Sequence, residues 1–237
     1  MATTYSHPTV FGADVFPGRF IEAAMEGLER PDLFVINAAK GVDLSEPVET
    51  LRSASERYDV VVITQPDSPV LPDMAEISGR HCLTVLHCPY MIGTHMTGLW
   101  RNVVNSIYRG WYDHLKDNGC RRSVLHALDA GRAAIASAGV GGEFNLSDGS
   151  DPLFEDVAEA LSIRLDHKRI PTLSPGKWRF VRRVAKLFGF KKMTSVMEAQ
   201  STDCVLDCSA WQSRFPDFVF TNVINYLSTH QYGTEDI

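Results

Sequence analysis

The sequence lacks several features that define whole classes of protein. No apolar run approaches the roughly 18–20 residues that a membrane-spanning helix requires. The first residues, MATTYSHPTVFGAD, have no basic region followed by an apolar stretch, so they do not form a signal peptide. The five cysteines are scattered and odd in number, which is typical of reduced thiols. These absences predict a soluble, cytoplasmic protein.

Basic charge is also in deficit, since 29 acidic residues outweigh 23 basic ones and give a net charge of −6. Such a surface gives no reason to expect nucleic acid as a partner. His81, Cys82, His87, Cys88 and His95 lie close in sequence, but their spacing matches no usual zinc pattern, so we expect no metal site. The chain also has no Gly-x-Ser-x-Gly elbow and no P-loop.

Short apolar runs alternate with segments of helical period along the whole chain. The runs at 33–38 and 58–64 are continuously apolar, as in strands buried on both faces. This alternation predicts an α/β fold with a mostly parallel sheet. Strands are expected at 9–11, 33–38, 58–64, 82–87, 123–126 and 143–146, and helices at 17–28, 47–57, 73–79, 98–109, 129–138, 153–165, 177–192 and 215–229.

Four segments of the second half occur in an informative order. They are Leu86 through Gly93, Ser123 through Ala133, Gly142 through Gly149, and the amphipathic stretch 153–165. In this order they resemble the LRPxxxxG turn, the xVHVxDxAxA strand and helix, the GExYNxxxG strand and the next helix of one family. That family is the extended short-chain dehydrogenases/reductases, the NAD-dependent epimerase/dehydratase group.

The resemblance implies a shortened Rossmann-like sheet with a small C-terminal substrate lobe. Residues 1–92 and 121–148 would form the Rossmann-like core, and 93–120 and 149–237 the lobe. It also implies NAD or NADP as cofactor, a nucleotide or sugar nucleotide as the small-molecule partner, and allows a homodimer.

The first glycine-containing loop resembles the family's GxxGxxG cofactor loop only in part. Gly12 and Gly18 fill the first and third glycine places. The middle place is Val15, whose branched side chain would project toward the phosphate oxygens. Asp14 brings a carboxylate that can cap the following helix but repels an anionic ligand. We therefore expect impaired pyrophosphate binding.

The ribose contact can be interpreted in two ways. If 33–38 is the second strand of the family's fold, its end offers Asn37 and Lys40 in place of the acid that holds a ribose. Lys40 would then meet a 2′-phosphate or remain a solvated lysine. Alternatively, Gly41 through Ser45 resembles the stretch after the family's third strand, which would mean that a strand–helix unit has been lost.

The family's catalytic pair is missing from its expected place. Hydride chemistry there uses a Tyr four residues before a Lys, because the cation lowers the pKa of the phenol. Only 17 residues, 65–81, separate the expected strands 58–64 and 82–87. Aligning Ala75-Glu76 with the family's residues after the lysine puts Ser68 at the Tyr position and Pro72 at the Lys position. A Tyr-x-x-x-Lys does occur at Tyr112 and Lys116, but in the lobe, where an exposed aromatic and a solvated lysine are expected.

Basic residues supply the remaining candidates. Arg121 and Arg122 lie where the family commonly has a cation that faces the substrate's diphosphate, although either could be a solvated loop residue. The segment 177–192 contains seven cations and no acid. It could lie on an anionic membrane, face a nucleotide diphosphate, or divide between core and water. Apart from this segment, we expect no membrane contact.

Two functions remain open. The first is a non-catalytic relative that binds a nucleotide or sugar nucleotide and has lost the Tyr/Lys pair; its NAD or NADP site is either retained or lost. The second is an active NAD(P)-dependent epimerase, dehydratase or reductase with a different proton donor. Because acceleration needs an interaction specific to the transition state, the missing pair favours the first.

Overall fold

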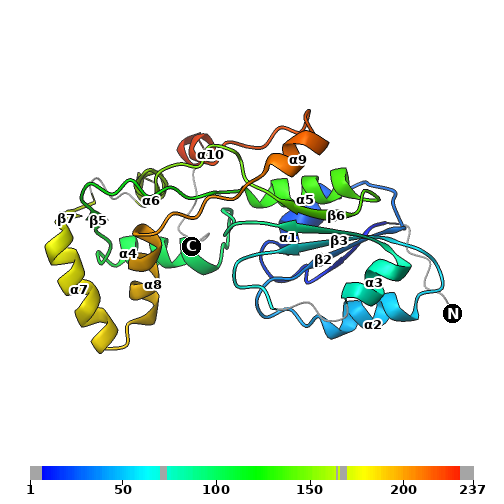
Figure 1. The fold of residues 1–237 in the computed structure, drawn as a ribbon, viewed down its shortest axis with the longest axis horizontal. Coiled ribbons are helices and arrows are strands. Elements are labelled where there is room, and N and C mark those ends of the chain that lie inside the picture. Colours follow the sequence, from blue (N-terminus) through cyan, green and yellow to red (C-terminus); the bar gives the residue numbers. More distant parts are fainter. Residues whose placement is uncertain (1–6, 70–73, 164, 166–169, 230–237) are drawn as a thin grey trace.

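The computed structural model describes residues 7–69, 74–163, 165 and 170–229. It confirms the α/β class: a five-stranded parallel sheet has the order β1-β2-β3-β4-β6 (Figure 1). The central strands β2 and β3 are buried on both faces, as their continuous apolar sequence predicts. The strands are β1 (Thr9–Phe11), β2 (Leu33–Asn37), β3 (Asp59–Thr64), β4 (Cys82–His87) and β6 (Gly142–Asn145).

Helices cover both faces of this sheet. On one face, α1 (Gly18–Ala24) and α5 (Ala127–Ser137) pack on each other and on an apolar cluster that includes Ile21, Val61 and Leu86. On the other face, α2 (Ser45–Ser53) and α3 (Met74–Arg80) cover Phe34, Ile36 and Val62 (Figure 1). The sheet is therefore the middle layer of three.

From β1 to β6, each strand lies beside the one before it in the sheet, always on the same side, although the connecting helices α1 and α2 lie on opposite faces of the sheet. Since α1 and α2 lie on opposite faces of parallel strands, their two crossovers have opposite hand. In a doubly wound sheet the order is 3-2-1-4-5-6, and the change of face accompanies the reversal at strand 1. Here β1 is an edge strand, so β2 and β3 take the places of strands 4 and 5. Strands 2 and 3 of that order have no counterpart among the described residues.

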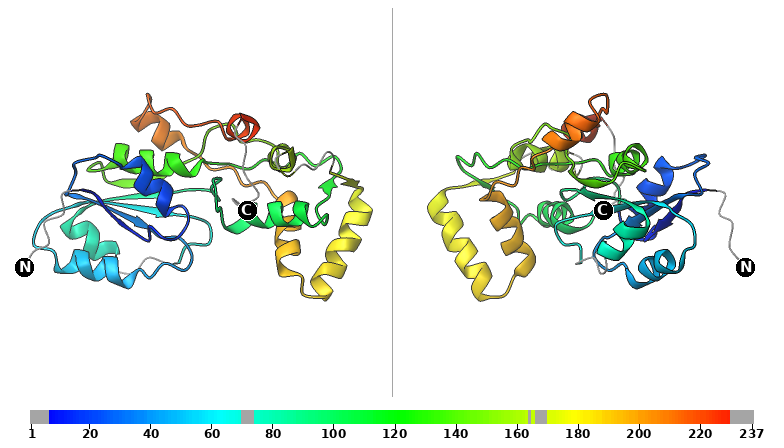
Figure 2. Two further views of the ribbon diagram at one scale, coloured as in Figure 1. Left: turned by 180° about the vertical axis from the view of Figure 1, so that it is seen from behind. Right: turned by 45° about the vertical axis from the view of Figure 1, so that its right-hand side comes forward.

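A second unit of helices lies beside the sheet (Figures 1 and 2). Its core is built around Trp100 and Phe154, whose ring centroids are 5.2 Å apart. The elements are α4 (Gly98–Tyr108), α6 (Phe154–Ile163), α7 (Pro175–Leu187), α8 (Lys191–Gln200), α10 (Val223–Thr229) and the short pair β5 (His114–Leu115) and β7 (Thr172–Leu173). Among the described residues, no helix is long and apolar enough to cross a membrane.

One helix within 149–237 packs on the sheet and was not expected from the sequence. The short helix α9 (Ser209–Arg214) places Trp211 in the same apolar cluster as Leu86 and Leu146. Its ring also contacts Phe144 of β6 and Phe215, at 5.7 and 4.1 Å between centroids. The chain thus returns to the sheet before it enters α10 (Figure 1).

Three expected elements need correction. Residues 123–126 are not a strand of the sheet, because their backbone bonds go to Ile92 and Cys204. The expected helix 177–192 is two helices, since Gly189 takes a φ of +71° and ends α7. The expected helix 215–229 begins only at Val223, after an irregular stretch packed around Trp211.

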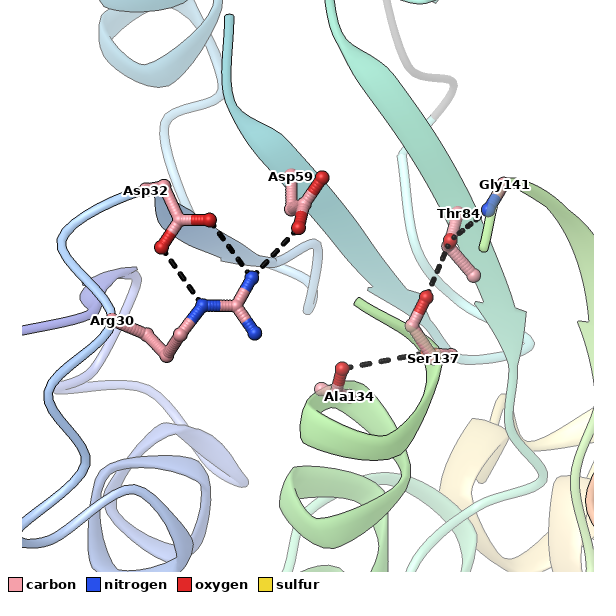
Figure 3. A network of polar contacts seen from close by, with 7 residues as sticks. All are labelled: Arg30, Asp32, Asp59, Thr84, Ala134, Ser137 and Gly141. Carbon is pink, nitrogen blue, oxygen red and sulfur yellow. Dashed lines mark hydrogen bonds and ion pairs between the residues drawn. The ribbon is translucent and has the colours of Figure 1, made fainter. Parts of the chain in front are cut away.

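Polar contacts bind the amino ends of the strands (Figure 3). Arg30 donates to both oxygens of Asp32, at 2.8 and 2.9 Å, and to Asp59 at 2.7 Å, which ties β2 to β3. The Thr84 hydroxyl donates to the Ser137 carbonyl and accepts from the Gly141 amide, which ties β4 to the α5–β6 turn. These contacts leave the opposite, carboxyl ends of the strands for a site.

Candidate functional site

A cleft of about 490 Å³ lies where the carboxyl ends of β2, β3 and β4 face α4 and α8. Lys40, Asp67 and Tyr90 enter it from the segments that follow the three strands, and Arg101 and Lys192 enter it from the helices. Ligands of open α/β sheets bind at this edge of the strands. Its volume lies in the range of about 300–1,000 Å³ found for small-molecule sites.

The cleft is positively charged although the chain is acidic. Lys40, Arg101, Arg122 and Lys192 line it, against the single carboxylate of Asp67. Within a protein of net charge −6, such a concentration of cations creates a local field that attracts anions. The arrangement is suited to a ligand with two or more negative charges.

Arg122 is the cation that the structure holds most firmly. Its Nη2 donates to the carbonyls of Ala199 and Thr202, at 3.1 and 3.2 Å, and its guanidinium lies 5.8 Å from the centre of the Phe154 ring. Its Nε is buried and has no partner among the described residues. Burial lowers the pKa of Arg122, but an arginine stays charged at neutral pH. Because this fixed cation also lines the cleft, it can attract an anionic ligand there.

Arg121 is the neighbour of Arg122 in sequence, but its side chain lies in a different environment. It is exposed, its Nη1 donates to the Asp151 carbonyl at 3.0 Å, and its amide donates to the Asp203 carboxylate at 2.6 Å. Arg121 does not line the cleft. Of the two predicted arginines, the structure brings only Arg122 together with Lys40.

Tyr90 is the one tyrosine that lines the cleft in the described chain. Burial is the main reason why the pKa of Tyr90 is raised; Asp67 adds to this effect and Arg122 opposes it. Its ring packs so closely on Gly98 that a Cβ there would lie 2.6 Å from ring carbons. The phenol is therefore protonated and held in place. Tyr90 lies within the family-like turn from Leu86 through Gly93, but no feature of the sequence indicated a role for it.

The predicted cofactor loop lies outside this cleft, between β1 and α1. The amides of Val15 and Gly18 donate to the loop's own carbonyls, at 3.2 and 2.7 Å. Asn37 Nδ2 donates to the carbonyls of Gly12 and Val15, at 2.9 and 2.7 Å. Asp14 is exposed, and no side chain caps α1. The loop is held by internal hydrogen bonds that occupy two of its amides.

Neither Ser68 with Pro72 nor Tyr112 with Lys116 supplies an activated tyrosine in the described part of the chain. The Ser68 hydroxyl accepts a bond from the Gln65 amide at 2.7 Å, and Pro72 lies outside the described residues. Tyr112 is buried rather than exposed, and burial raises its pKa, the reverse of what activation requires. Lys116 is exposed and does not line the cleft.

The family-like turn after residue 126 is organised by a buried carboxylate. Asp129 accepts bonds from Arg132 Nη1 at 2.5 Å and from the Thr221 amide at 2.6 Å. These contacts tie α5 to the segment before α10. Within the described residues, no three or more His, Cys, Asp or Glu side chains group as metal ligands would.

Comparisons with known proteins establish the fold. No protein-family profile and no curated protein sequence matches the chain. Solved structures do match the chain. One is UDP-N-acetylglucosamine 4-epimerase from Bacillus cereus, which is 14% identical and matches with a TM-score of 0.55 over 95% of this chain and 99% of that one. GDP-L-fucose synthetase from Naegleria fowleri (10%, 0.61) matches over 96% and 92%. GDP-mannoheptose C4 reductase from Campylobacter jejuni with NADP bound (9%, 0.57) matches over 96% and 98%.

These likenesses confirm the family resemblance at the level of fold. The chain has a shortened Rossmann-like fold, similar to that of this epimerase, this synthetase and this NADP-bound reductase. At identities of 9–14%, the shared fold alone does not carry the chemistry to this chain.

Proposed function

We propose that this protein binds a sugar nucleotide by its diphosphate in the cationic cleft, without the standard hydride chemistry of its structural relatives. The observation that carries the proposal is Arg122, a half-buried cation that two backbone carbonyls hold in place in the lining of the cleft. A planar guanidinium suits phosphate oxygens because it can donate two parallel bonds. We assign the diphosphate contact to Arg122 rather than to Arg121.

The rest of the cleft complements such a ligand. Lys40, Arg101 and Lys192 add charge around the same cavity, which offsets the two negative charges of a diphosphate. Several structural relatives act on UDP- or GDP-linked sugars by name. Within the proposal, Lys40 is a diphosphate contact and not a ribose contact.

We further propose that the NAD or NADP site has been lost. A dinucleotide binds across the point where strand order reverses, and the described sheet has no such reversal. The loop from Gly12 to Gly18 would also bring Val15 and the Asp14 carboxylate to the pyrophosphate, with two amides already engaged. These observations support its role as a packing turn that joins β1 to α1.

The second candidate is an NAD(P)-dependent enzyme that uses Tyr90 as proton donor. The position of Tyr90 in the lining of the cleft favours this candidate over any other tyrosine in the described chain. The raised pKa makes Tyr90 a hydrogen-bond donor at neutral pH and a poor base. For that reason we rank binding above catalysis.

Titration calorimetry with UDP- and GDP-sugars tests the proposal, with NAD and NADP as comparison ligands. We expect a sugar nucleotide to bind and Arg122→Ala to weaken it about tenfold or more, since a charge-assisted contact is lost. Arg121→Ala is the matched control and should leave the affinity unchanged.

Equal losses in the two variants, or tight binding of NAD or NADP with no sugar-nucleotide binding, would contradict the proposal. A turnover of sugar nucleotide and dinucleotide that Tyr90→Phe abolishes would establish the second candidate instead.

A further inference from the structure

Helices α7 and α8 form a hairpin that projects from the end of the molecule far from the sheet (Figures 1 and 2). The turn Phe188-Gly189-Phe190 joins them at the tip. The buried side chains of the hairpin are Trp178 and Ala185 of α7 and Val196, Met197 and Gln200 of α8, and Val196 belongs to the core around Trp100. These side chains are the inward-facing part of the hairpin.

A second apolar surface remains on the outside of the hairpin. Leu187, Phe188 and Phe190 at the tip are 80%, 68% and 56% exposed, and Phe180 on α7 is 69% exposed. Phe180 and Leu187 are seven residues apart and therefore share one face of the helix. The rings of Phe188 and Phe190 stack with centroids 6.3 Å apart. No described residue covers this apolar tip, made of Phe180, Leu187, Phe188 and Phe190.

The hairpin that carries the apolar tip also carries cations that have no acidic partner among the described residues. Glu198 pairs with Arg182 and Lys186, at 3.0 and 2.8 Å. The other five basic side chains of the segment form no ion pair within the described residues; they are Lys177, Arg179, Arg183, Lys191 and Lys192. In a chain of net charge −6, this segment carries an isolated positive surface.

Exposed aromatic side chains and cations also lie together between the tip and α4. An open groove of about 680 Å³ lies between the tip and α4, lined by Trp111, Phe190, Arg109 and Lys191 among others. Trp111 is 58% exposed, and the Arg109 guanidinium lies 5.5 Å from its ring centre. Aromatic side chains flanked by arginine and lysine are typical of surfaces at a membrane–water boundary.

We propose that the hairpin docks on an anionic lipid bilayer, with the apolar tip inserted at the level of the headgroups and the cations on the lipid phosphates. Charge complementarity selects this partner, since an anionic surface offers phosphates to the free cations of the hairpin that do not line the cleft, Lys177, Arg179, Arg183 and Lys191. A protein partner fits less well, because a convex tip of four side chains offers little of the roughly 800 Å² per partner that a stable interface buries. Insertion and charge together give reversible binding that depends on salt.

Co-sedimentation with vesicles tests this inference on the full chain. Neutral phosphatidylcholine vesicles are compared with vesicles that contain about 30% phosphatidylglycerol, at low and high salt. We expect the wild type to bind the anionic vesicles at least about tenfold more strongly and to be released by about 0.5 M NaCl.

Two variants separate the two contributions. The triple variant Leu187→Ser, Phe188→Ser and Phe190→Ser removes the apolar tip, and Lys177→Glu, Arg179→Glu and Arg183→Glu reverses the charge. Each should lower vesicle binding about tenfold. The control replaces Ile163 and Val219, which are equally exposed elsewhere, by Ser and should bind like the wild type. Thermal unfolding confirms that each variant is folded.

Absence of wild-type binding to anionic vesicles at low salt would overturn the inference. So would full binding by a folded apolar-tip variant. A wild type that ignores lipid but self-associates through the apolar tip would identify a second copy of the chain as the partner instead. Sugar-nucleotide affinity is a separate readout, because none of the substituted residues lines the cleft.

Discussion

Gly18 illustrates how a single residue can keep a structural role whatever the loop binds. It begins α1, and a Cβ at this position would collide with the Gly12 carbonyl and with the backbone of Ala13. Neither contact can relax, since both involve backbone atoms of the same turn. The third glycine of the loop is therefore required by helix packing, with or without a phosphate.

We predict that Gly18→Ala destabilises the protein by about 1–3 kcal/mol or more, because the added methyl group overpacks the turn. Denaturant unfolding gives this free energy. Gly79→Ala is the matched control: its Cβ would meet nothing within 4 Å, its φ is not positive, and it lies in α3. The control should be neutral or stabilising by up to about 1 kcal/mol. Equal effects would show that the collision is not decisive.

Among the arginines, the sequence and the structure contributed different information. The resemblance put Arg121 and Arg122 together as candidates because they are adjacent. Adjacent residues on extended backbone point in opposite directions, and only the tertiary structure shows that Arg122 faces the cleft. Asp67, Tyr90, Arg101 and Lys192 join it from separate segments, and no local pattern marks them as a group.

At the level of elements, α9 shows how packing fixes a helix that the sequence pattern does not reveal. It is six residues long, too short for a periodic signal, and without neighbours it would be unstable. Trp211 is only 1% exposed and contacts Phe144, Phe215, Phe218 and Phe220. The aromatic cluster thus fastens the chain to β6 before α10.

We predict that Trp211→Ala lowers the free energy of unfolding by about 3–5 kcal/mol, because a large cavity opens beside the sheet. Thermal or denaturant unfolding measures the change. Val219→Ala, at a side chain 72% exposed in the same segment, is the control and should cost less than about 0.5 kcal/mol. A small effect of Trp211→Ala would mean that α9 does not contribute to the core.

At the scale of the whole molecule, opposite charges occupy different regions. The chain is acidic overall, but Lys40, Arg101, Arg122 and Lys192 converge on the cleft and the hairpin adds further cations. The fold brings the four cleft cations together from segments far apart in the chain. The local field at the cleft is therefore a property of the tertiary structure.

We predict that sugar-nucleotide affinity falls as ionic strength rises from about 50 mM to about 500 mM, because added salt shortens the distance over which opposite charges attract each other. Calorimetry across this range gives the slope. Arg122→Ala should show a shallower slope, and Arg121→Ala the wild-type slope. An affinity independent of salt would exclude an electrostatic basis for binding.

The sequence by itself determined the five strands that form the sheet and the four longer helices on its faces, because buried strands need continuous apolar runs and the covering helices need a periodic face. The runs at 33–38 and 58–64 fixed β2 and β3 within a residue. It also determined the family-like order of motifs, which the shared fold confirms. Such features are local, so a short stretch of sequence is enough to predict them.

Only the tertiary structure decided that the strand order does not reverse within the part of the sheet that the structure describes, since apolar runs do not indicate which strand is the neighbour. It also decided that the basic segment is a hairpin with an apolar tip, because the backbone conformation of Gly189 and the packing of α8 set the break. Strand neighbours and exposed surfaces depend on contacts between distant residues, and such contacts exist only after folding.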